Sequence, residues 1–182
     1  MSHTKFLGVY VDEDLNWKYH ASQISLKVSK CTGVINRVKH VLTRDLWTSL
    51  YFSLVQPYFV YCNIVWGGAS QSALYRLTCL QKRPLRMITF SEYRAPSNSL
   101  FCRLGILKLY DLYKMNVLIF MYKMTFHLLP LSSSQLIQFS DRACSYNFRK
   151  KVEFKLCRYQ SKLREESLGI VGPKLWHQAG RY

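Results

Sequence analysis

The stretch "KFLGVYVDEDLNWKYH", residues Lys5–His20, contains the change of pattern that decides the fold. Its first half, Lys5–Val11, predicts one β-strand, and the acidic residues that follow predict a turn and the start of a helix. From there to about Pro130, the apolar residues recur with a period of about 3.6 instead of two. The sequence therefore predicts a mainly α protein, a helical bundle preceded by one short β-strand or hairpin.

The predicted strand has no evident partner in the sequence. Only four residues precede Lys5, yet the backbone N–H and C=O groups of a strand need partners. A sheet of fewer than about three strands is also marginal by itself. We therefore expect this strand to pair with a segment outside this chain.

The first helix is predicted from an apolar stripe in which steps of four and three residues alternate. The stripe consists of Ile24, Val28, Cys31, Ile35, Val38 and Leu42. Lys30 and Arg37 lie on nearly the opposite face of this helix. Asp14 or Asn16 is expected to cap its first turn, because a short polar side chain accepts from the free amides there.

Proline and capping residues divide the next part of the chain. Thr43 is expected to cap a second helix, which Pro57 kinks or ends. A third helix is expected to begin near Ser70 or Ser72, with a local break at Pro84.

Two further helices complete the predicted bundle. Ser97 or Asn98 is expected to begin a short helix that ends at Gly105. Asp111 is expected to cap the last helix, which ends before Pro130. The apolar face that we expect this last helix to bury consists of Leu112, Met115, Ile119, Tyr122 and Phe126.

The composition changes at "PLSSSQ", Pro130–Gln135, which predicts a flexible connection. Beyond it, Arg142–Arg164 contains eight basic residues against one acid, Glu153, without a sustained helical period. Such an irregular basic tail either wraps a phosphate backbone or is poorly ordered. We therefore expect three parts, residues 1–14, 15–130 and 131–182.

The charge balance indicates a polyanionic partner. The 26 Lys and Arg residues against 10 Asp and Glu residues give a net charge of +16, and three of the acids are adjacent at Asp12–Asp14. Nucleic acid is the first candidate, because each neutralised phosphate releases counterions, and an anionic membrane surface is the second. The alternative is that basic residues only keep an apolar chain soluble.

Neither secretion nor a membrane span is expected. The six cysteines show no CxxC or zinc-ligand spacing and are typical of core residues in a reducing compartment. No leader opens the chain, and the most apolar window, Tyr113–Met124, is too short and too polar to cross a bilayer. We expect an intracellular protein, cytoplasmic or nuclear, with no membrane partner.

No complete active site is visible in the sequence. Two-metal phosphoryl transfer needs carboxylates that converge from separate strands, and none of the nine residues before Tyr10 is acidic. Asp12–Asp14 is therefore expected to be an acidic turn at a helix N-terminus. The five histidines are expected to be surface or cap residues, and no GxSxG or phosphate-binding glycine loop occurs. We predict no catalytic residue, no metal ligand and no cofactor in this chain.

Six segments carry a resemblance to a known family. They are "KFLGVYVDEDLNWKYH", "LYFSLVQPYFVYCNIVWG", "LYRLTCLQKRPLRMIT", "LYDLY", "YNFRKK" and "GPKLWHQ". In this order they resemble the region that follows the catalytic palm in reverse transcriptases of non-LTR, LINE-type retrotransposons, especially the jockey-like branch. Three residues depart from the family pattern, which usually has a helix former, Thr and Asn at the positions of Pro84, Phe148 and His177.

The residues that match the family pattern lie mainly in the first four segments. They are Lys5–Val9, Asp12, Leu15, Trp17, His20, Tyr51, Leu54, Pro57, Tyr61, Trp66, Gly67, Leu77, Leu80, Gln81, Lys82, Leu85, Arg86 and Leu109–Leu112.

The resemblance implies a role for each part of the chain. Residues 1–14 would be a remnant of the last palm hairpin, the primer-grip region. Residues 15–130 would be the helical thumb and the helices after it, and residues 131–182 a linker and basic tail. The catalytic aspartates, the Mg²⁺ of the full-length enzyme and the missing palm and fingers would lie outside this chain, which alone is expected to be inactive.

The expected ligand is an RNA–DNA hybrid, held through its backbone and A-like shape along the minor groove. We expect a continuous track of phosphate contacts formed by Lys27, Lys30, Arg37, Arg44, Lys82, Arg83, Arg86, Arg149, Lys150 and Lys151. Primer-grip-like contacts are expected at Phe6, Leu7 and Gly8, although Gly8 is equally well explained by a bulge or a strand end.

Two other classes of function remain open at this stage. One is an inactive remnant or a helical protein-interaction module with no role in nucleic-acid binding. The other is a basic membrane-surface protein. The first helix argues against the membrane-surface protein, because its apolar face fits a packed core.

Overall fold

The computed structural model describes residues 3–41, 43–137 and 154–179. The chain divides into two compact units, Met1–Tyr113 and Lys114–Tyr182, and each is described by itself. This division falls inside a helix, whereas the sequence predicted boundaries after residues 14 and 130. The assignment of those three parts to a palm remnant, a thumb and a tail stays a prediction.

The described residues are mainly helical, as predicted, with one pair of short antiparallel strands at the N-terminus. Among the helices in these ranges, none combines the length and the apolarity that crossing a membrane requires. In chain order the elements are β1 (His3–Phe6), β2 (Val9–Asp12), α1 (Lys18–Val38), α2 (Arg44–Leu54), α3 (Gln56–Val60), α4 (Asn63–Trp66), α5 (Gln71–Ile88), α6 (Ser97–Leu104), α7 (Leu109–Thr125), the 3-10 helix η1 (Leu131–Leu136), α8 (Lys162–Glu165) and α9 (Leu168–Ala179).

The predicted strand is a hairpin that pairs with itself. β1 and β2 are antiparallel, with His3 opposite Asp12 and Phe6 opposite Val9. The chain reverses at Leu7 and Gly8, whose φ values of 44° and 84° are typical of a two-residue hairpin turn. The expectation that this strand pairs only outside the chain was therefore wrong. Gly8 is explained by the turn, because glycine adopts positive φ at no steric cost.

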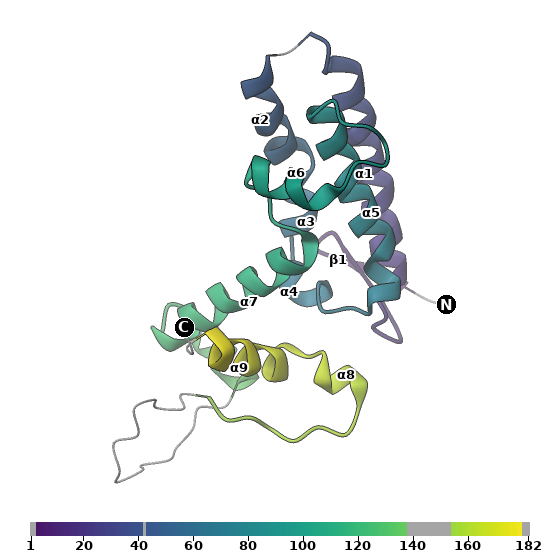
Figure 1. Ribbon diagram of the computed structural model, residues 1–182. Helices are drawn as coiled ribbons and strands as arrows, with labels where there is room; N and C mark the ends of the chain where they lie inside the picture. The colour runs from purple at the N-terminus through teal and green to yellow at the C-terminus, as the bar shows by residue number, and fades with distance from the viewer. Residues whose placement is uncertain (1–2, 42, 138–153, 180–182) are drawn as a thin grey trace. The chain divides into compact units, whose positions relative to one another are not determined.

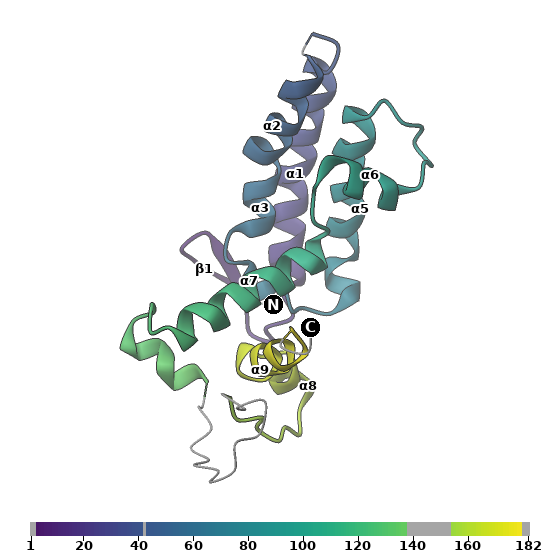
Figure 2. The same ribbon diagram turned by 60° about the vertical axis from the view of Figure 1, so that its left-hand side comes forward.

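In the first unit, α1 and α5 lie side by side, and α2, α3 and α6 surround them (Figures 1 and 2). The predicted apolar stripe of the first helix is confirmed at Ile24, Val28 and Ile35, which are all buried. The helix ends at Val38, and Leu42 lies outside the described residues. Each buried aliphatic side chain stabilises the core by about 1.5–3 kcal/mol. Facing residues of α5 include Leu77, Leu80 and Leu85.

The start of α1 is organised by polar side chains before it. The Oδ1 atom of Asn16 accepts a hydrogen bond from the Lys18 amide at 3.0 Å, and Asp12 Oδ1 accepts from the Trp17 amide at 3.4 Å. The N-cap position itself is Trp17, in a left-handed conformation with φ 61°. Asn16 thus satisfies a donor of the first turn, as predicted, without being the capping residue.

Most of the predicted helix boundaries are confirmed within a residue or two. Pro57 lies in the first turn of α3, directly after α2 ends. Ser70 caps α5 by accepting from the Ala73 amide at 3.4 Å. Gly105 follows α6 with φ 62°. Pro84 is the exception, because α5 continues past it to Ile88 and the proline side chain is buried.

A buried glutamine joins three segments of the first unit. Gln81 of α5 donates from Nε2 to the Tyr51 hydroxyl at 3.2 Å and to the Leu107 carbonyl at 2.8 Å, and its Oε1 accepts from the Leu109 amide at 2.9 Å. Burial raises the pKa of Tyr51 to about 12. Gln81 and Tyr51 both lie in the segments that resemble reverse transcriptases. Their hydrogen bonds join α2, α5 and the start of α7.

The second unit contains the larger part of α7, together with η1, α8 and α9. Gly172 of α9 lies so close to α7 that a Cβ atom would stand 2.6 Å from the Met121 sulfur. The Phe154 and Trp176 rings make an edge-to-face contact with centroids 5.9 Å apart. Residues 131–182 were expected to be irregular, but α8 and α9 show that part of this region is helical.

The predicted packing face of α7 was wrong for most of its residues. Leu112 is buried as expected, whereas Val117, Met121 and Met124 fill the buried side in place of the predicted residues. The exposed side chains form a stripe, here called the α7 stripe, that consists of Met115, Ile119, Tyr122 and Phe126, with exposed fractions of 38, 44, 51 and 57%. Because apolar residues occur on nearly every side of α7, the period alone does not identify the side that packs.

Candidate nucleic-acid interface

The outward side of α1 carries a group of cations without acidic neighbours on the same helix. α1 contains Lys18, Lys27, Lys30 and Arg37 and no Asp or Glu over its 21 residues. Lys30 and Arg37 are exposed and lie opposite the buried stripe. Lys27 is turned toward α3, where its Nζ lies 5.8 Å from the centroid of the Tyr58 ring. Lys30 and Arg37 are therefore exposed α1 cations on the side of the helix away from the core.

The predicted phosphate-binding cations of α5 differ in their exposure and in their hydrogen bonds. Arg83 is exposed and Lys82 is half-buried. Arg86 donates from Nε and Nη2 to the Ala95 carbonyl, at 3.1 and 3.0 Å. The guanidinium of Arg86 thus fastens the loop after α5, a structural role that the sequence analysis missed.

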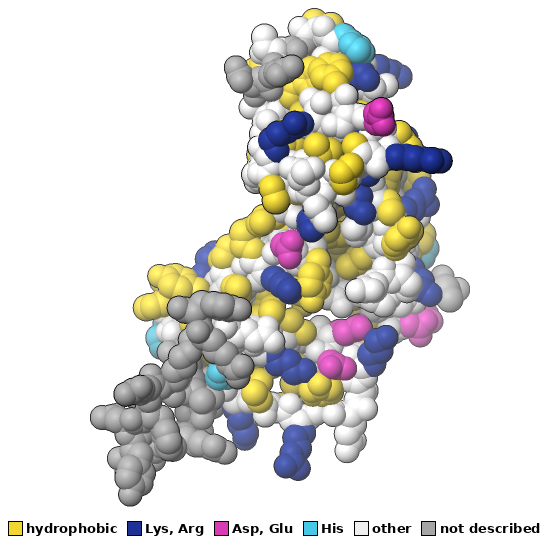
Figure 3. Space-filling view, in the orientation of Figure 1, with side chains coloured by type: hydrophobic (Ala, Val, Ile, Leu, Met, Phe, Trp, Pro, Cys, Tyr) yellow, Lys and Arg dark blue, Asp and Glu magenta, His cyan; other side chains and the backbone are white. Residues whose placement is uncertain are grey.

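The predicted continuous track of cations stays a prediction. The buried sides of α1 and α5 belong to the same core, and neither helix contains an Asp or Glu. On the face that Figure 3 shows, Lys and Arg side chains are spread among apolar and uncharged surface.

Four other predicted cations are not placed by the structure. Arg44 is the first residue of α2, but its side chain is outside the described part. Arg149, Lys150 and Lys151 also lie outside the described residues. Their predicted phosphate contacts stay predictions.

The hairpin tip presents two apolar side chains. Phe6 and Leu7 are 67% and 73% exposed, and Leu7 holds a positive φ that is uncommon for a non-glycine residue. The Tyr61 hydroxyl donates to the Leu7 carbonyl at 2.5 Å and so fixes the tip to the end of α3. Gly8 lies beside the Tyr61 ring, because a Cβ atom built on it would lie 3.7 Å from that ring.

His20 joins the hairpin to α1, and its expected surface or cap role was wrong. Its Nδ1 accepts from the Tyr10 amide at 3.3 Å, while its ring lies 5.5 Å from the Trp66 ring. The imidazole is 4% exposed. Burial, with a smaller contribution from Lys27, lowers the pKa of His20 from 6.5 to about 4. His20 is therefore neutral near pH 7 and acts as a structural acceptor.

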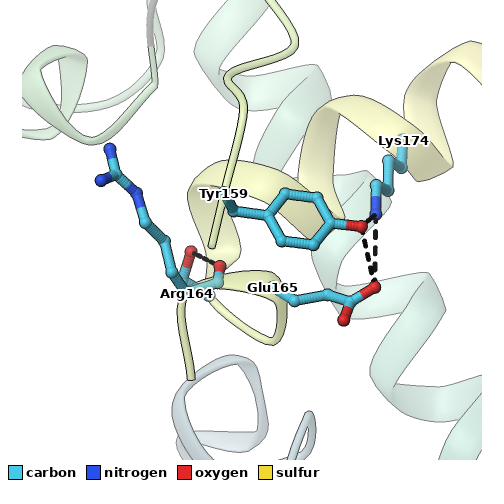
Figure 4. Close-up of polar contacts among 5 residues, drawn as sticks. Tyr159, Arg164, Glu165 and Lys174 are labelled. Carbon is cyan, nitrogen blue, oxygen red and sulfur yellow. Dashed lines mark hydrogen bonds and ion pairs between the residues drawn. The ribbon is translucent and has the colours of Figure 1, made fainter. Parts of the chain in front are cut away.

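The second unit holds a polar network at the surface (Figure 4). Lys174 donates to the Tyr159 hydroxyl at 2.8 Å, and that hydroxyl donates to Glu165 Oε1 at 2.9 Å. The Lys174 ammonium also lies 3.7 Å from Glu165 Oε1. The tyrosine hydroxyl and the carboxylate raise the pKa of Lys174, so this lysine stays charged. The network joins α8 to α9 and offers no neutral amine for nucleophilic chemistry.

The residues that the structure describes do not form a metal-binding site. No three His, Cys, Asp or Glu side chains within those ranges come together as a metal site would require. Asp12, the first residue of the acidic turn, instead accepts from the Trp17 amide before α1.

Comparison with known proteins gives one weak relationship. A curated protein described as "RNA-directed DNA polymerase from mobile element jockey", from Drosophila funebris, is 25% identical over 118 residues, which cover 61% of this chain. This chain spans 13% of the length of that relative. No protein-family model and no solved structure matches the chain. The similarity supports, at a coarse level, an origin related to the reverse transcriptases of retrotransposons.

Proposed function

We propose that this chain is a piece of a non-LTR retrotransposon reverse transcriptase, from the region after the catalytic palm, and that it binds template–primer nucleic acid through the sugar–phosphate backbone. The observation that carries the proposal is the outward side of α1. That side presents cations from a 21-residue helix without a single acid, while the opposite side is fixed in the core.

Electrostatics favour a polyanion on this helix. No acid within α1 is available to pair with Lys30 or Arg37, so both charges are free of i, i+4 partners. Each phosphate that they neutralise would release condensed counterions, which is the main source of sequence-independent affinity. The similarity to a protein named as an RNA-directed DNA polymerase supports a template–primer duplex as the ligand.

Catalysis is assigned to parts of the parent enzyme outside this chain. The described residues do not fit the magnesium site that such an enzyme uses, because they bring no set of carboxylates together. The palm and fingers are accordingly proposed as the partners that complete the enzyme, and this chain alone is proposed to be inactive.

The proposal is tested by the salt dependence of binding to an RNA–DNA hybrid. Between about 50 and 200 mM salt, the affinity of the wild-type chain is expected to fall by about tenfold or more. The double variant Lys30→Ala/Arg37→Ala is expected to flatten the slope of log affinity against log salt by about one per lost contact.

A charge-matched control separates local contacts from net charge. The double variant Arg103→Ala/Lys108→Ala removes two exposed cations that lie outside α1 and is expected to keep nearly the wild-type slope. A wild-type affinity that does not change with salt would refute the proposal, and equal slopes for the two double variants would refute the role of α1.

A protein-interaction module is the second candidate, and the α7 stripe favours it. Four large apolar side chains exposed at helical spacing are typical of a surface that another helix covers. A soluble chain with a cooperative melt that binds no hybrid would support this candidate, whereas aggregation of the isolated chain would support an inactive remnant.

A further inference from the structure

The outward side of α5 carries cations without an acid on the same helix. α5 contains Arg76, Lys82, Arg83 and Arg86 and no Asp or Glu over its 18 residues. Arg76 and Arg83 are exposed. They lie nearly two turns apart, about 10 Å along the helix axis, on the side roughly opposite the buried Gln81. This side of α5 therefore presents two cations to a polyanion.

Exposed aromatic side chains lie at both ends of this side. Tyr75 stands next to Arg76 near the start of α5 and is 70% exposed. Phe90 directly follows Thr89, the C-cap of the helix, and is 57% exposed. Cations combined with exposed rings are typical of surfaces that bind single-stranded nucleic acid.

The backbone holds Phe90 in a conformation that is unusual for a bulky residue. Its φ is 49°. The Phe90 amide donates to the Met87 carbonyl at 3.3 Å, and the Ser91 amide donates to the Arg86 carbonyl at 3.0 Å. These two hydrogen bonds form a Schellman motif, in which glycine is the usual residue at the position of Phe90. The end of the helix itself therefore does not require an aromatic residue there.

Ring contacts join Phe90 to two other segments at one end of the bundle (Figure 1). The centroid of its ring lies 4.8 Å from that of Trp47 in α2 and 6.0 Å from that of His40 after α1. Because Trp47 is buried, Phe90 helps to cover the core at this end. More than half of the Phe90 surface nevertheless stays exposed, which leaves room for a further stacking partner.

The loop after α5 is fastened at the same end of the helix. Arg86 donates two hydrogen bonds to the Ala95 carbonyl, at 3.1 and 3.0 Å. The loop carries Tyr93, which is 79% exposed, and the exposed, oppositely charged residues Glu92 and Arg94. It therefore adds a second exposed ring near Phe90 without adding net charge.

We infer that the outward side of α5 binds an unpaired strand of nucleic acid, whose phosphates contact Arg76 and Arg83 while its bases stack on Tyr75 and Phe90. The inference rests on the proposed function and adds to it a place for the single-stranded part of the template. Stacking on an aromatic ring needs an exposed base face, which a single strand offers along its length and a duplex hides except at its ends.

The length of α5 fits a short single strand. The 15 residues from Tyr75 to Phe90 correspond to about 22 Å at about 1.5 Å per residue. At about 3.4 Å per stacked nucleotide, this length matches about six nucleotides. The two cations lie between the two rings, so phosphate contacts and base contacts would alternate along one strand.

The test measures binding of the full chain to a single strand of about 12 nucleotides without self-complementary sequence, a length within known site sizes. The double variant Tyr75→Leu/Phe90→Leu keeps the net charge and an apolar side chain against Trp47 but removes both flat rings. Its affinity for the single strand is expected to fall by about tenfold or more. Its affinity for a blunt-ended duplex of the same strand is expected to change by less than about twofold.

Salt dependence separates the rings from the cations. The double variant Tyr75→Leu/Phe90→Leu is expected to keep the wild-type slope of log affinity for the single strand against log salt, because it removes no charge. Arg76→Ala/Arg83→Ala is expected to flatten that slope by about one per lost contact. The single variant Tyr75→Leu, at an exposed helix position, is expected to lose affinity without lowering the melting temperature.

Tyr110→Leu is the matched control. Tyr110 is 62% exposed, but it follows Leu109, whose amide donates to Gln81 on the buried side of α5. Loss of this ring is expected to leave the affinity for the single strand nearly unchanged. A loss as large as that of Tyr75→Leu would show that exposed rings in general hold the strand, and it would overturn the assignment to the outward side of α5.

The outcomes separate the inference from the proposed function. If the wild-type chain binds the RNA–DNA hybrid in a salt-dependent manner and the variant without the two rings binds the single strand as well as wild type does, the inference is overturned and the proposed function stands. An equal loss for the duplex, or for poly-glutamate as a polyanion without bases, would also overturn the inference. If the wild-type chain shows no salt-dependent binding to the hybrid, the proposed function fails, and a loss confined to the single strand would support the α5 site by itself.

Discussion

Single residues in this chain show that the matched positions of the family pattern are mainly structural. The buried Gln81 side chain makes three hydrogen bonds, and Trp66 is buried and donates from Nε1 to the Tyr61 carbonyl at 2.9 Å. His20 accepts from the hairpin. The family pattern includes these positions, but their roles depend on contacts between segments that are distant in sequence, and no local spacing reveals such contacts.

His20 should make the stability of the hairpin and α1 depend on pH. The unfolded chain has a histidine pKa of about 6.5, and burial lowers the folded value to about 4. The stabilising contribution of the neutral ring is therefore complete above about pH 6.5 and is lost as the pH falls toward 4. It is expected to amount to at most about 3 kcal/mol. Protonation would put an N–H on Nδ1, opposite the Tyr10 amide that now donates to it.

The variant His20→Asn supplies the comparison for this prediction. Its side-chain oxygen keeps an acceptor near the Tyr10 amide but does not titrate in this range. In thermal melts between pH 7 and 4, the melting temperature of wild type is expected to fall more steeply than that of the variant. Parallel pH profiles would show that His20 does not cause the pH dependence.

At the scale of elements, the sequence predicted helix positions well and packing sides less well. α5 and α6 begin and end close to the predicted residues, because capping residues and glycine act locally. The hairpin turn at Leu7 and Gly8 was missed, since a leucine at positive φ is not a usual turn signal. Pro84 did not break α5, because burial of the ring in the core holds the helix together around it.

The two sides of α7 should respond differently to substitution. Met121 is fully buried, so Met121→Ala is expected to destabilise the chain by about 2–5 kcal/mol. Ile119 belongs to the α7 stripe and is 44% exposed, so Ile119→Gln is expected to change stability by less than about 0.5 kcal/mol. Urea unfolding followed by circular dichroism measures both changes. A cost for Ile119→Gln as large as that for Met121→Ala would mean that the stripe is packed in solution.

For the molecule as a whole, the sequence predicted the sign of the charge but not its distribution. The net charge of +16 follows from 26 basic and 10 acidic residues, whereas the placement of the α1 and α5 cations on the surface depends on how those helices pack. Among the described residues, Lys174 and Glu165 form an ion pair at 3.7 Å. Because the cations exceed the acids by 16 charges, repulsion between like charges should outweigh attraction across the free chain.

This imbalance predicts opposite salt effects on folding and on binding. Added salt shortens the screening length to about 8 Å at 0.15 M, which weakens repulsion among the excess cations. The melting temperature of the free chain is therefore expected to rise between about 50 and 200 mM NaCl, while the affinity for an RNA–DNA hybrid falls over the same range. Thermal melts without nucleic acid measure the first effect, and titrations with the hybrid measure the second. A melting temperature that falls with salt would show that attractive ion pairs dominate in the folded chain. In that case the cations of α1 would be paired within the protein and would not be open to a phosphate backbone.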